Sequence, residues 1–221
     1  MNIFDILGPV MVGPSSSHTA GAVRIGCTAA ALLGERVAEA KIGLHGSFAA
    51  TGKGHGTDRA LVAGLLGMRP DDMRIPESFE IARREQMNFE ICEMQISGAH
   101  PNTAYLKIKG ESGKVLEMEA ASVGGGRIRI SRLDGIDVSC SGDKPTLILN
   151  NVDQPGFVAG VTTLLAQNSV NIATMNLYRD KRGGNAVTVI ESDQEIPEKI
   201  IQEMKMVPGL LKVTYLKGGD V

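Results

Sequence analysis

The sequence lacks tryptophan altogether and has only three tyrosines among its 221 residues. Aromatic platforms on which bases or sugars stack are therefore scarce. The sequence also lacks an excess of either charge, because 23 basic residues are balanced by 25 acidic ones. Binding along a nucleic-acid backbone or to an anionic membrane needs a clustered positive field, so this balance argues against both kinds of partner.

No segment has the pattern of a membrane span or an export signal. The first ten residues carry Asp5 where a signal peptide would be positively charged. The most apolar helical stretch, residues 20–33, contains Arg24 and is too short to cross a bilayer. We therefore expect a cytoplasmic protein.

Potential metal ligands are few and scattered. The cysteines are Cys27, Cys92 and Cys140, and the histidines are His18, His45, His55 and His100. No C-x-x-C and no H-x-x-x-H pair occurs, so the spacing predicts neither a zinc ribbon nor an iron–sulfur site within this chain. We expect three buried, reduced thiols and a packed His45, and any metal would need ligands from a partner chain.

The residues that are present, 43% hydrophobic and 22% charged, are those of a globular protein. The small, polar stretch 139–145 (SCSGDKP) indicates a domain boundary between residues 1–142 and residues 146–217. Beyond it, alternating and helical apolar patterns predict strands and helices over 146–150, 157–167, 170–179 and 186–192, then a helix opened by Pro197 and a strand over 210–217. The order β-α-β-β-α-β is ferredoxin-like.

The first part has the pattern of a mixed α/β domain, which makes the whole chain α/β (α+β). Helices are predicted from the loop 13–19 to Leu33, over 58–66 and over 78–86. Strands are predicted over 41–48, near 89–96 and over 127–133. Residues 104–109 and 115–121 flank a turn-forming segment and predict a hairpin.

Residues 13–21, GPSSSHTAG, place four hydroxyl side chains around a histidine just before a helix. Ser16 or Ser17 suits the N-cap, and the free N–H groups of a helix start favour a carboxylate or phosphate. His18 titrates near neutral pH and is able to move a proton. Since a plain cap needs one hydroxyl, the pattern favours a functional site.

Residues 52–58, GKGHGTD, form a second motif of this kind. Glycines on both sides of His55 let the backbone approach a ligand closely, and Thr57 suits the cap of the next helix. The motif is neither a P-loop nor a dinucleotide-binding loop. A flexible turn before a capped helix explains it equally well alone, but two such loops favour one shared pocket. The segments 100–103 (HPNT) and 122–128 (SVGGGRI) are weaker candidates to line it.

In this order, the four motifs resemble the β chain of the bacterial iron–sulfur L-serine dehydratase family over the whole chain. The part from Thr146 resembles an ACT domain, and the first part resembles the allosteric substrate-binding domain of phosphoglycerate dehydrogenase. The resemblance implies an ammonia-lyase that converts L-serine to pyruvate and ammonia. It also implies a separate α chain, without which the enzyme is inactive and whose cysteines hold a [4Fe-4S] cluster.

The resemblance also implies roles for individual residues. His18 and His55 are the catalytic candidates, with a preference for His18 as the base because hydroxyls are able to orient its ring. The substrate-binding candidates are Ser15, Ser16, Ser17, Thr19, Lys53, Thr57, Asp58 and Asn102. In the ACT part, the regulatory candidates Asn151 and Asp153 occupy the loop in which serine-sensing relatives bind an effector, with identities that depart from that pattern.

Two other functions are compatible with the sequence. A non-catalytic amino-acid sensor would use both domains but has no need of two proton-transfer groups. A pyridoxal-phosphate dehydratase would use Lys53, but no other motif for that cofactor occurs. Whatever the function, we expect a homodimer contact through residues 146–217, because such four-stranded sheets usually pair across a two-fold axis.

Overall fold

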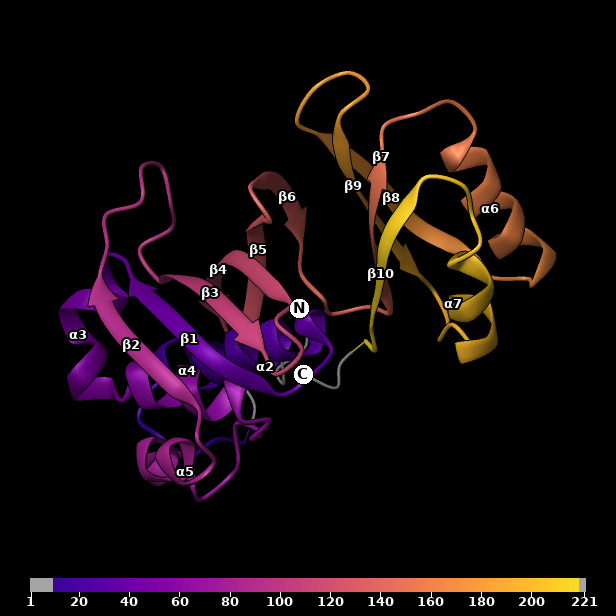
Figure 1. Cartoon of the computed structure of the whole chain (residues 1–221). Helices are drawn as coiled ribbons and strands as arrows, with labels where there is room; N and C mark the ends of the chain where they lie inside the picture. The colour runs from indigo at the N-terminus through magenta and orange to yellow at the C-terminus, as the bar shows by residue number, and fades with distance from the viewer. Residues whose placement is uncertain (1–9, 219–221) are drawn as a thin grey trace. The chain divides into compact units, whose positions relative to one another are not determined.

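The computed structural model describes residues 10–218, which form two compact units divided between Gly135 and Ile136 (Figure 1). Asp5, the residue that argued against a signal peptide, lies outside the described residues. Within residues 10–218, no helix is long and apolar enough to span a bilayer.

A six-stranded sheet forms the framework of the first unit. Its strands are β1 (Val37–Leu44), β2 (Asn88–Glu93), β3 (Thr103–Gly110), β4 (Val115–Gly124), β5 (Arg127–Leu133) and β6 (Ile136–Cys140). Their order is β2-β1-β3-β4-β5-β6. The strands β1 and β2 are parallel because helices connect them, whereas β3 pairs antiparallel with β1 and β4, and β4 with β5. The last strand of this sheet, β6, belongs to the second unit when the chain is divided by its contacts.

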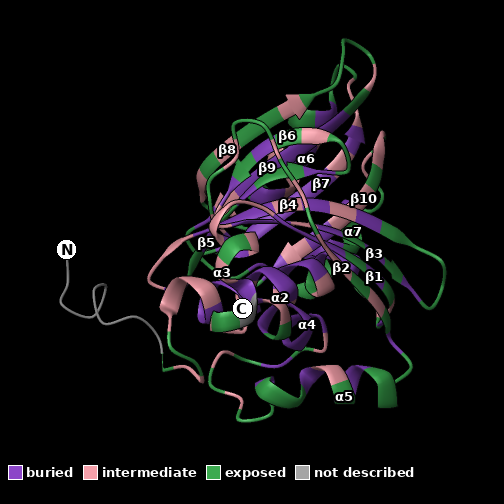
Figure 2. Ribbon diagram, turned by 90° about the vertical axis from the view of Figure 1, so that its left-hand side faces the viewer, coloured by how far each residue is buried: buried purple, intermediate pink, exposed green. Residues whose placement is uncertain are grey.

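Two helices, α2 (Gly21–Leu33) and α4 (Thr57–Leu65), are the most buried helices of this unit (Figure 2). They cross closely at two glycines. A Cβ atom on Gly64 would lie 2.1 Å from the Val23 carbonyl oxygen, and one on Gly26 would lie 2.4 Å from the Leu61 carbonyl oxygen. Shorter elements complete the helical layer: the π-helical turn η1 (Ser16–Ala20), α3 (Ser47–His55), the 3₁₀ turn η2 (Ile75–Glu77) and α5 (Ser78–Arg84).

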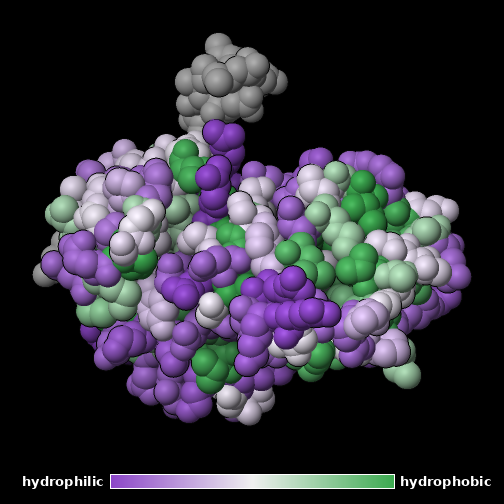
Figure 3. All heavy atoms as spheres, turned by 90° about the horizontal axis from the view of Figure 1, so that it is seen from above, coloured by the Kyte–Doolittle hydropathy of each residue, from purple (hydrophilic) through white to green (hydrophobic). Residues whose placement is uncertain are grey.

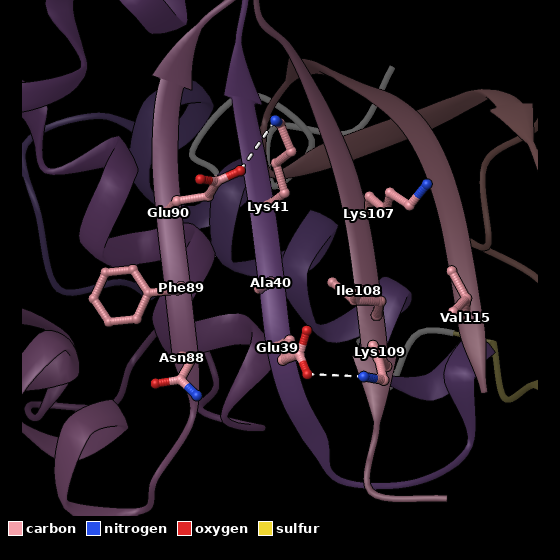
Figure 4. Close-up of a pocket in the computed structure, with 10 residues that line it drawn as sticks. All are labelled: Glu39, Ala40, Lys41, Asn88, Phe89, Glu90, Lys107, Ile108, Lys109 and Val115. Atoms are coloured by element: carbon pink, nitrogen blue, oxygen red, sulfur yellow. Dashed lines mark hydrogen bonds and ion pairs between the residues drawn. The ribbon is translucent and has the colours of Figure 1, made fainter. Parts of the chain in front are cut away.

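The opposite face of the sheet carries charged residues, with the helices behind it in Figure 4. Lys41 Nζ lies 3.0 Å from Glu90 Oε1, and Lys109 Nζ lies 2.9 Å from Glu39 Oε1, each pair joining two adjacent strands. A hollow of about 460 Å³ lies among these side chains. Its charges are largely exposed and already paired, so this face is a solvated surface on which ion pairs contribute little stability.

The second unit contains a four-stranded sheet with order β10-β7-β9-β8. Its elements are β7 (Thr146–Val152), α6 (Phe157–Gln167), β8 (Ile172–Arg179), β9 (Asn185–Ser192), α7 (Glu198–Met204) and β10 (Leu210–Leu216). Apolar residues of both helices pack on Leu147, Leu149 and Ile190 of the sheet. The space-filling view shows hydrophobic patches between hydrophilic side chains (Figure 3), and Val158 of α6 and Leu177 of β8 are exposed.

The predicted fold class, a mixed α/β domain followed by a ferredoxin-like β-α-β-β-α-β unit, is confirmed. Two local predictions for the first unit are wrong. The strand expected over 41–48 ends at Leu44, since Gly46 turns the chain with φ 57° and ψ −121°. The glycine-rich segment after it is helical and belongs to α3, which ends where Gly56 adopts the left-handed conformation.

Three further expectations need correction. Ser15, and neither Ser16 nor Ser17, is the N-cap of η1, because its side chain is the one that accepts an N–H of the first turn. Gly56 is the N-cap of α4, so Thr57 is the first residue of this helix, and its hydroxyl makes no cap hydrogen bond. Of the three thiols, Cys140 is buried, whereas Cys27 and Cys92 are half-buried.

Candidate functional site

His18 lies in the turn η1, and its ring folds back on the residue that caps this turn. The Ser15 hydroxyl oxygen accepts the His18 backbone N–H at 3.2 Å and lies 3.3 Å from ring atom Nδ1. The other ring nitrogen, Nε2, lies 3.0 Å from the hydroxyl oxygen of Ser47, the first residue of α3. Both nitrogens of His18 therefore have a hydroxyl partner.

His55, the last residue of α3, lies against the same ring. The ring centroids of His18 and His55 are 4.9 Å apart at an interplanar angle of 69°. Phe48, in the first turn of α3, packs edge-on against the His18 ring as well. The Thr19 hydroxyl donates to the His55 carbonyl oxygen at 3.3 Å, which ties the two histidine-bearing segments together. The two histidine-bearing segments, which the sequence predicts to share a pocket, are thus in contact.

The two histidines differ in what their ring nitrogens contact. His55 Nδ1 is buried and has no hydrogen-bond partner among the described residues. Burial, and then the neighbouring His55, lower the pKa of His18 below its ordinary value of 6.5. His18 is therefore held by two hydroxyls and has a lowered pKa, whereas one ring nitrogen of His55 is buried without a partner among the described residues.

The segments HPNT and SVGGGRI meet the same region through their backbones. The Pro101 carbonyl oxygen accepts the Ser47 N–H at 2.7 Å, and the Asn102 carbonyl oxygen accepts the Ser122 N–H at 3.0 Å. The Ser122 side chain packs on the start of α2, where a Cβ on Gly21 would lie 2.1 Å from its hydroxyl oxygen. All four motifs are therefore linked by direct contacts.

Two hydroxyls near these segments have no partner within residues 10–218. Thr57 and Ser122 are fully buried, and neither side-chain oxygen makes a hydrogen bond there. A buried hydroxyl without a partner costs free energy, so such groups point to a bound molecule or ordered water.

Ser47 and Ser122 are both absent from the residues singled out by sequence as ligands. Ser47 has no motif around it, and only the fold brings it to His18.

The remaining candidates lie around the histidine pair or point elsewhere. Ser16 and Ser17 are half-buried in η1. Lys53 lies in α3, and its side chain is outside the described part of the structure. The Asp58 carboxylate accepts the N–H of Arg59 at 2.8 Å, which directs it to the start of its own helix.

His45 fulfils the expected packing role. Its Nδ1 atom accepts the N–H of Ile96 at 3.2 Å, just beyond the end of β1. His100 is exposed, and its Nδ1 accepts the Asn102 N–H at 3.1 Å within the HPNT turn. Neither of these two histidines contacts the His18–His55 pair through a described hydrogen bond.

In the second unit, the two regulatory candidates bind their own neighbours. Asn151 is buried, and its side-chain oxygen accepts the Thr188 hydroxyl at 3.0 Å. The Asp153 carboxylate accepts the Gly183 N–H at 3.0 Å and an Arg179 N–H at 2.9 Å, and both contacts hold the pKa of Asp153 below its ordinary value. These bonds fasten β7 to the β8–β9 hairpin, and effector binding at this loop stays a prediction.

The described residues do not fit an iron–sulfur cluster. Within residues 10–218, no group of three or more histidine, cysteine or acidic side chains is placed to hold a metal ion. Burial raises the pKa of Cys27 to about 11 and that of Cys140 to about 12. Thiols with such pKa values are protonated at neutral pH and are poor ligands.

Comparison with known proteins assigns both units. Residues 2–92 match the family model "Serine dehydratase beta chain", and residues 145–209 match the ACT domain. The probable L-serine dehydratase β chain of Bacillus subtilis is 41% identical over 97% of each chain. The L-serine dehydratase β chain of Peptoniphilus asaccharolyticus is 37% identical over 89% of each chain. D-3-phosphoglycerate dehydrogenase of Methanocaldococcus jannaschii is 28% identical over 58% of this chain and 24% of its own length. This chain therefore belongs to the L-serine dehydratase β-chain family.

Proposed function

We propose that this chain supplies one part of the active site of a two-chain L-serine dehydratase. L-Serine loses its α-proton and its hydroxide, which leaves aminoacrylate and water. Aminoacrylate then tautomerises and takes up water, which gives pyruvate and ammonia. Family membership supports the substrate and the reaction. The chain's own contribution is the histidine pair, with hydroxyls around it, in the segments 13–21 and 46–58.

The observation that carries this proposal is the buried ring nitrogen of His55 that has no hydrogen-bond partner among the described residues. A general base must reach the α-proton of the substrate with a free lone pair. Both nitrogens of His18 are engaged by serine hydroxyls, whereas His55 Nδ1 has no partner among the described residues. We therefore assign proton abstraction to His55 and the support of its ring to His18, although the sequence alone had favoured His18.

The hydroxyls near the pair divide into two sets. Ser15 and Thr19 bind the histidine segments themselves. Ser16 and Ser17 make no described side-chain bond to that pair and are half-buried, which suits them to the carboxylate and amino groups of L-serine. The buried, unpartnered hydroxyl of Thr57 suits the same purpose. For Lys53, Asp58 and Asn102, substrate contacts stay proposals that rest on the family pattern alone.

A separate α chain completes the proposed enzyme. Because the described residues offer no cluster ligands, the cysteines that hold a [4Fe-4S] cluster would belong to that α chain. A homodimer contact through residues 146–217 is proposed in addition. The edge strand β8 supports it, since Leu177 is exposed and no charge occurs between Ile172 and Tyr178.

The test is reconstitution. This chain, the α chain and their complex are purified without oxygen and assayed for pyruvate formed from L-serine. We expect the complex alone to be active, and this chain alone to be inactive and colourless. Turnover by this chain alone would refute the two-chain proposal. Specific L-serine binding to this chain, combined with full activity of the α chain by itself, would favour a sensor.

A further inference from the structure

We propose that Ser47 is a positioning residue that holds the His18 ring in one orientation and one tautomer, and thereby fixes the His18–His55 pair. This inference rests on the proposed function only for its kinetic consequence. Ser47 lies outside every motif that the sequence singled out and contacts the pair from the first turn of α3.

We assign the tautomer from the partners of the two ring nitrogens. The Ser15 oxygen already accepts the His18 backbone N–H, so its own O–H is available to donate to Nδ1. A neutral imidazole has one acceptor nitrogen and one N–H. With Nδ1 as the acceptor, the proton lies on Nε2, which donates to the Ser47 oxygen 3.0 Å away. Ser15 and Ser47 thus bind opposite sides of one ring.

The backbone around Ser47 is fixed by Pro101, in the turn that precedes β3. The Pro101 carbonyl oxygen accepts the N–H groups of Ser47 and Phe48, at 2.7 and 3.4 Å. Gly46 has φ 57°, and a Cβ there would lie 2.6 Å from the Pro101 oxygen, so this close approach requires glycine. The Ser47 hydroxyl therefore stands on a helix start that the HPNT turn holds in place.

The orientation of His18 matters because His55 packs on it. The two rings meet edge to face with centroids 4.9 Å apart, and Phe48 occupies a second side of His18. Without the Ser47 oxygen, the Nε2 proton loses its acceptor and the ring is free to turn. The His55 ring then loses the packed neighbour that helps to fix its own orientation.

The first experiment observes the ring directly in the full chain by ¹⁵N NMR of histidine-labelled protein, with His18 assigned through a His18→Gln variant. We expect His18 to show one tautomer with the proton on Nε2, Ser47→Ala to show a mixture, and Ser47→Thr to restore the single tautomer. Thr51→Ala is the matched control, because it removes another hydroxyl of the same helix. That hydroxyl donates to the Ser47 carbonyl oxygen and contacts neither histidine ring by a described hydrogen bond. An unchanged tautomer in Ser47→Ala refutes the proposal.

The second experiment measures L-serine turnover by the complex with the α chain. We expect Ser47→Ala to lower kcat by roughly 10- to 100-fold. We expect its KM to change by less than about twofold, since a positioning residue acts in the transition state. Ser47→Thr should retain most activity. A raised KM with unchanged kcat would instead make Ser47 a substrate ligand. If the complex has no activity on L-serine, the proposed function fails, while the NMR result still decides the role of Ser47.

Discussion

At the scale of single residues, the sequence predicts the two histidines but not their difference. Each histidine lies in a glycine- and hydroxyl-rich motif, and that pattern is visible without a structure. Which ring nitrogen is free depends on Ser47, which lies in an ordinary helical segment and reaches His18 only through the fold. A side chain without a local motif leaves no sequence signal, so this difference between the two rings could not be predicted from the sequence.

The lowered pKa of His18 predicts how the stability of the chain depends on pH. The unfolded state takes up this proton near pH 6.5, whereas the folded state takes it up only at a lower pH. The stability is therefore full above about pH 6.5 and falls as the pH is lowered through the folded pKa. Denaturant unfolding of the full chain between about pH 7.5 and about pH 5 measures this decline. His18→Gln should make it shallower, and an unchanged slope would contradict the assignment of the shift to His18.

At the scale of elements, prediction succeeded where the local pattern decides the structure. The helix over 157–167 was predicted with the observed bounds, because its apolar spacing and its turn residues are local. The hairpin of β3 and β4 is likewise confirmed. The segment around Gly46 was predicted wrongly, because the group that caps α3 is the carbonyl oxygen of Pro101, which is remote in sequence. A cap supplied by a turn remote in the sequence cannot be read from the residues it caps.

The close crossing of α2 and α4 predicts that alanine is tolerated differently at two helical glycines, Gly64 of α4 at the crossing and Gly54 of α3 away from it. Glycine to alanine favours a helix by about 0.5–1 kcal/mol where there is space. Nothing lies within 4 Å of a Cβ on Gly54, so Gly54→Ala should stabilise the chain. A Cβ on Gly64 would meet the Val23 carbonyl at 2.1 Å, so Gly64→Ala should destabilise it by about 1–3 kcal/mol. Urea unfolding of both variants provides the comparison, and equal shifts would mean that the close crossing is not the reason for Gly64.

At the scale of the whole molecule, the order of the two units was predictable and their division less so. A polar stretch marked a boundary near Gly142, where the second set of regular patterns begins. Contacts divide the chain earlier, after Gly135, because β6 groups with the second unit while its hydrogen bonds extend the first sheet. A strand shared in this way has no signature in composition, and the boundary from sequence stays a prediction.

Truncation tests this organisation. A chain that ends after Gly142 keeps β6 and all four motifs, so we expect it to fold and to retain L-serine turnover with the α chain. If the second unit forms the homodimer, the mass of the complex by light scattering should fall by more than the mass of the deleted residues, because the dimer separates. A chain that ends after Gly135 also loses β6 and should be less stable to denaturant. Identical assembly, saturation curve and effector response in the Gly142 truncation and the full chain would exclude a role for the second unit.

The central claim is that His55 of this chain removes the α-proton of L-serine. Its most direct test is the steady-state turnover of the complex formed by the α chain with the His55→Ala chain, measured beside the wild-type and His18→Ala complexes. We predict a kcat lower by about 100-fold or more in His55→Ala, with a nearly unchanged KM and intact assembly. Near-normal turnover in His55→Ala, together with a large loss in His18→Ala, would contradict the account and assign the base to His18.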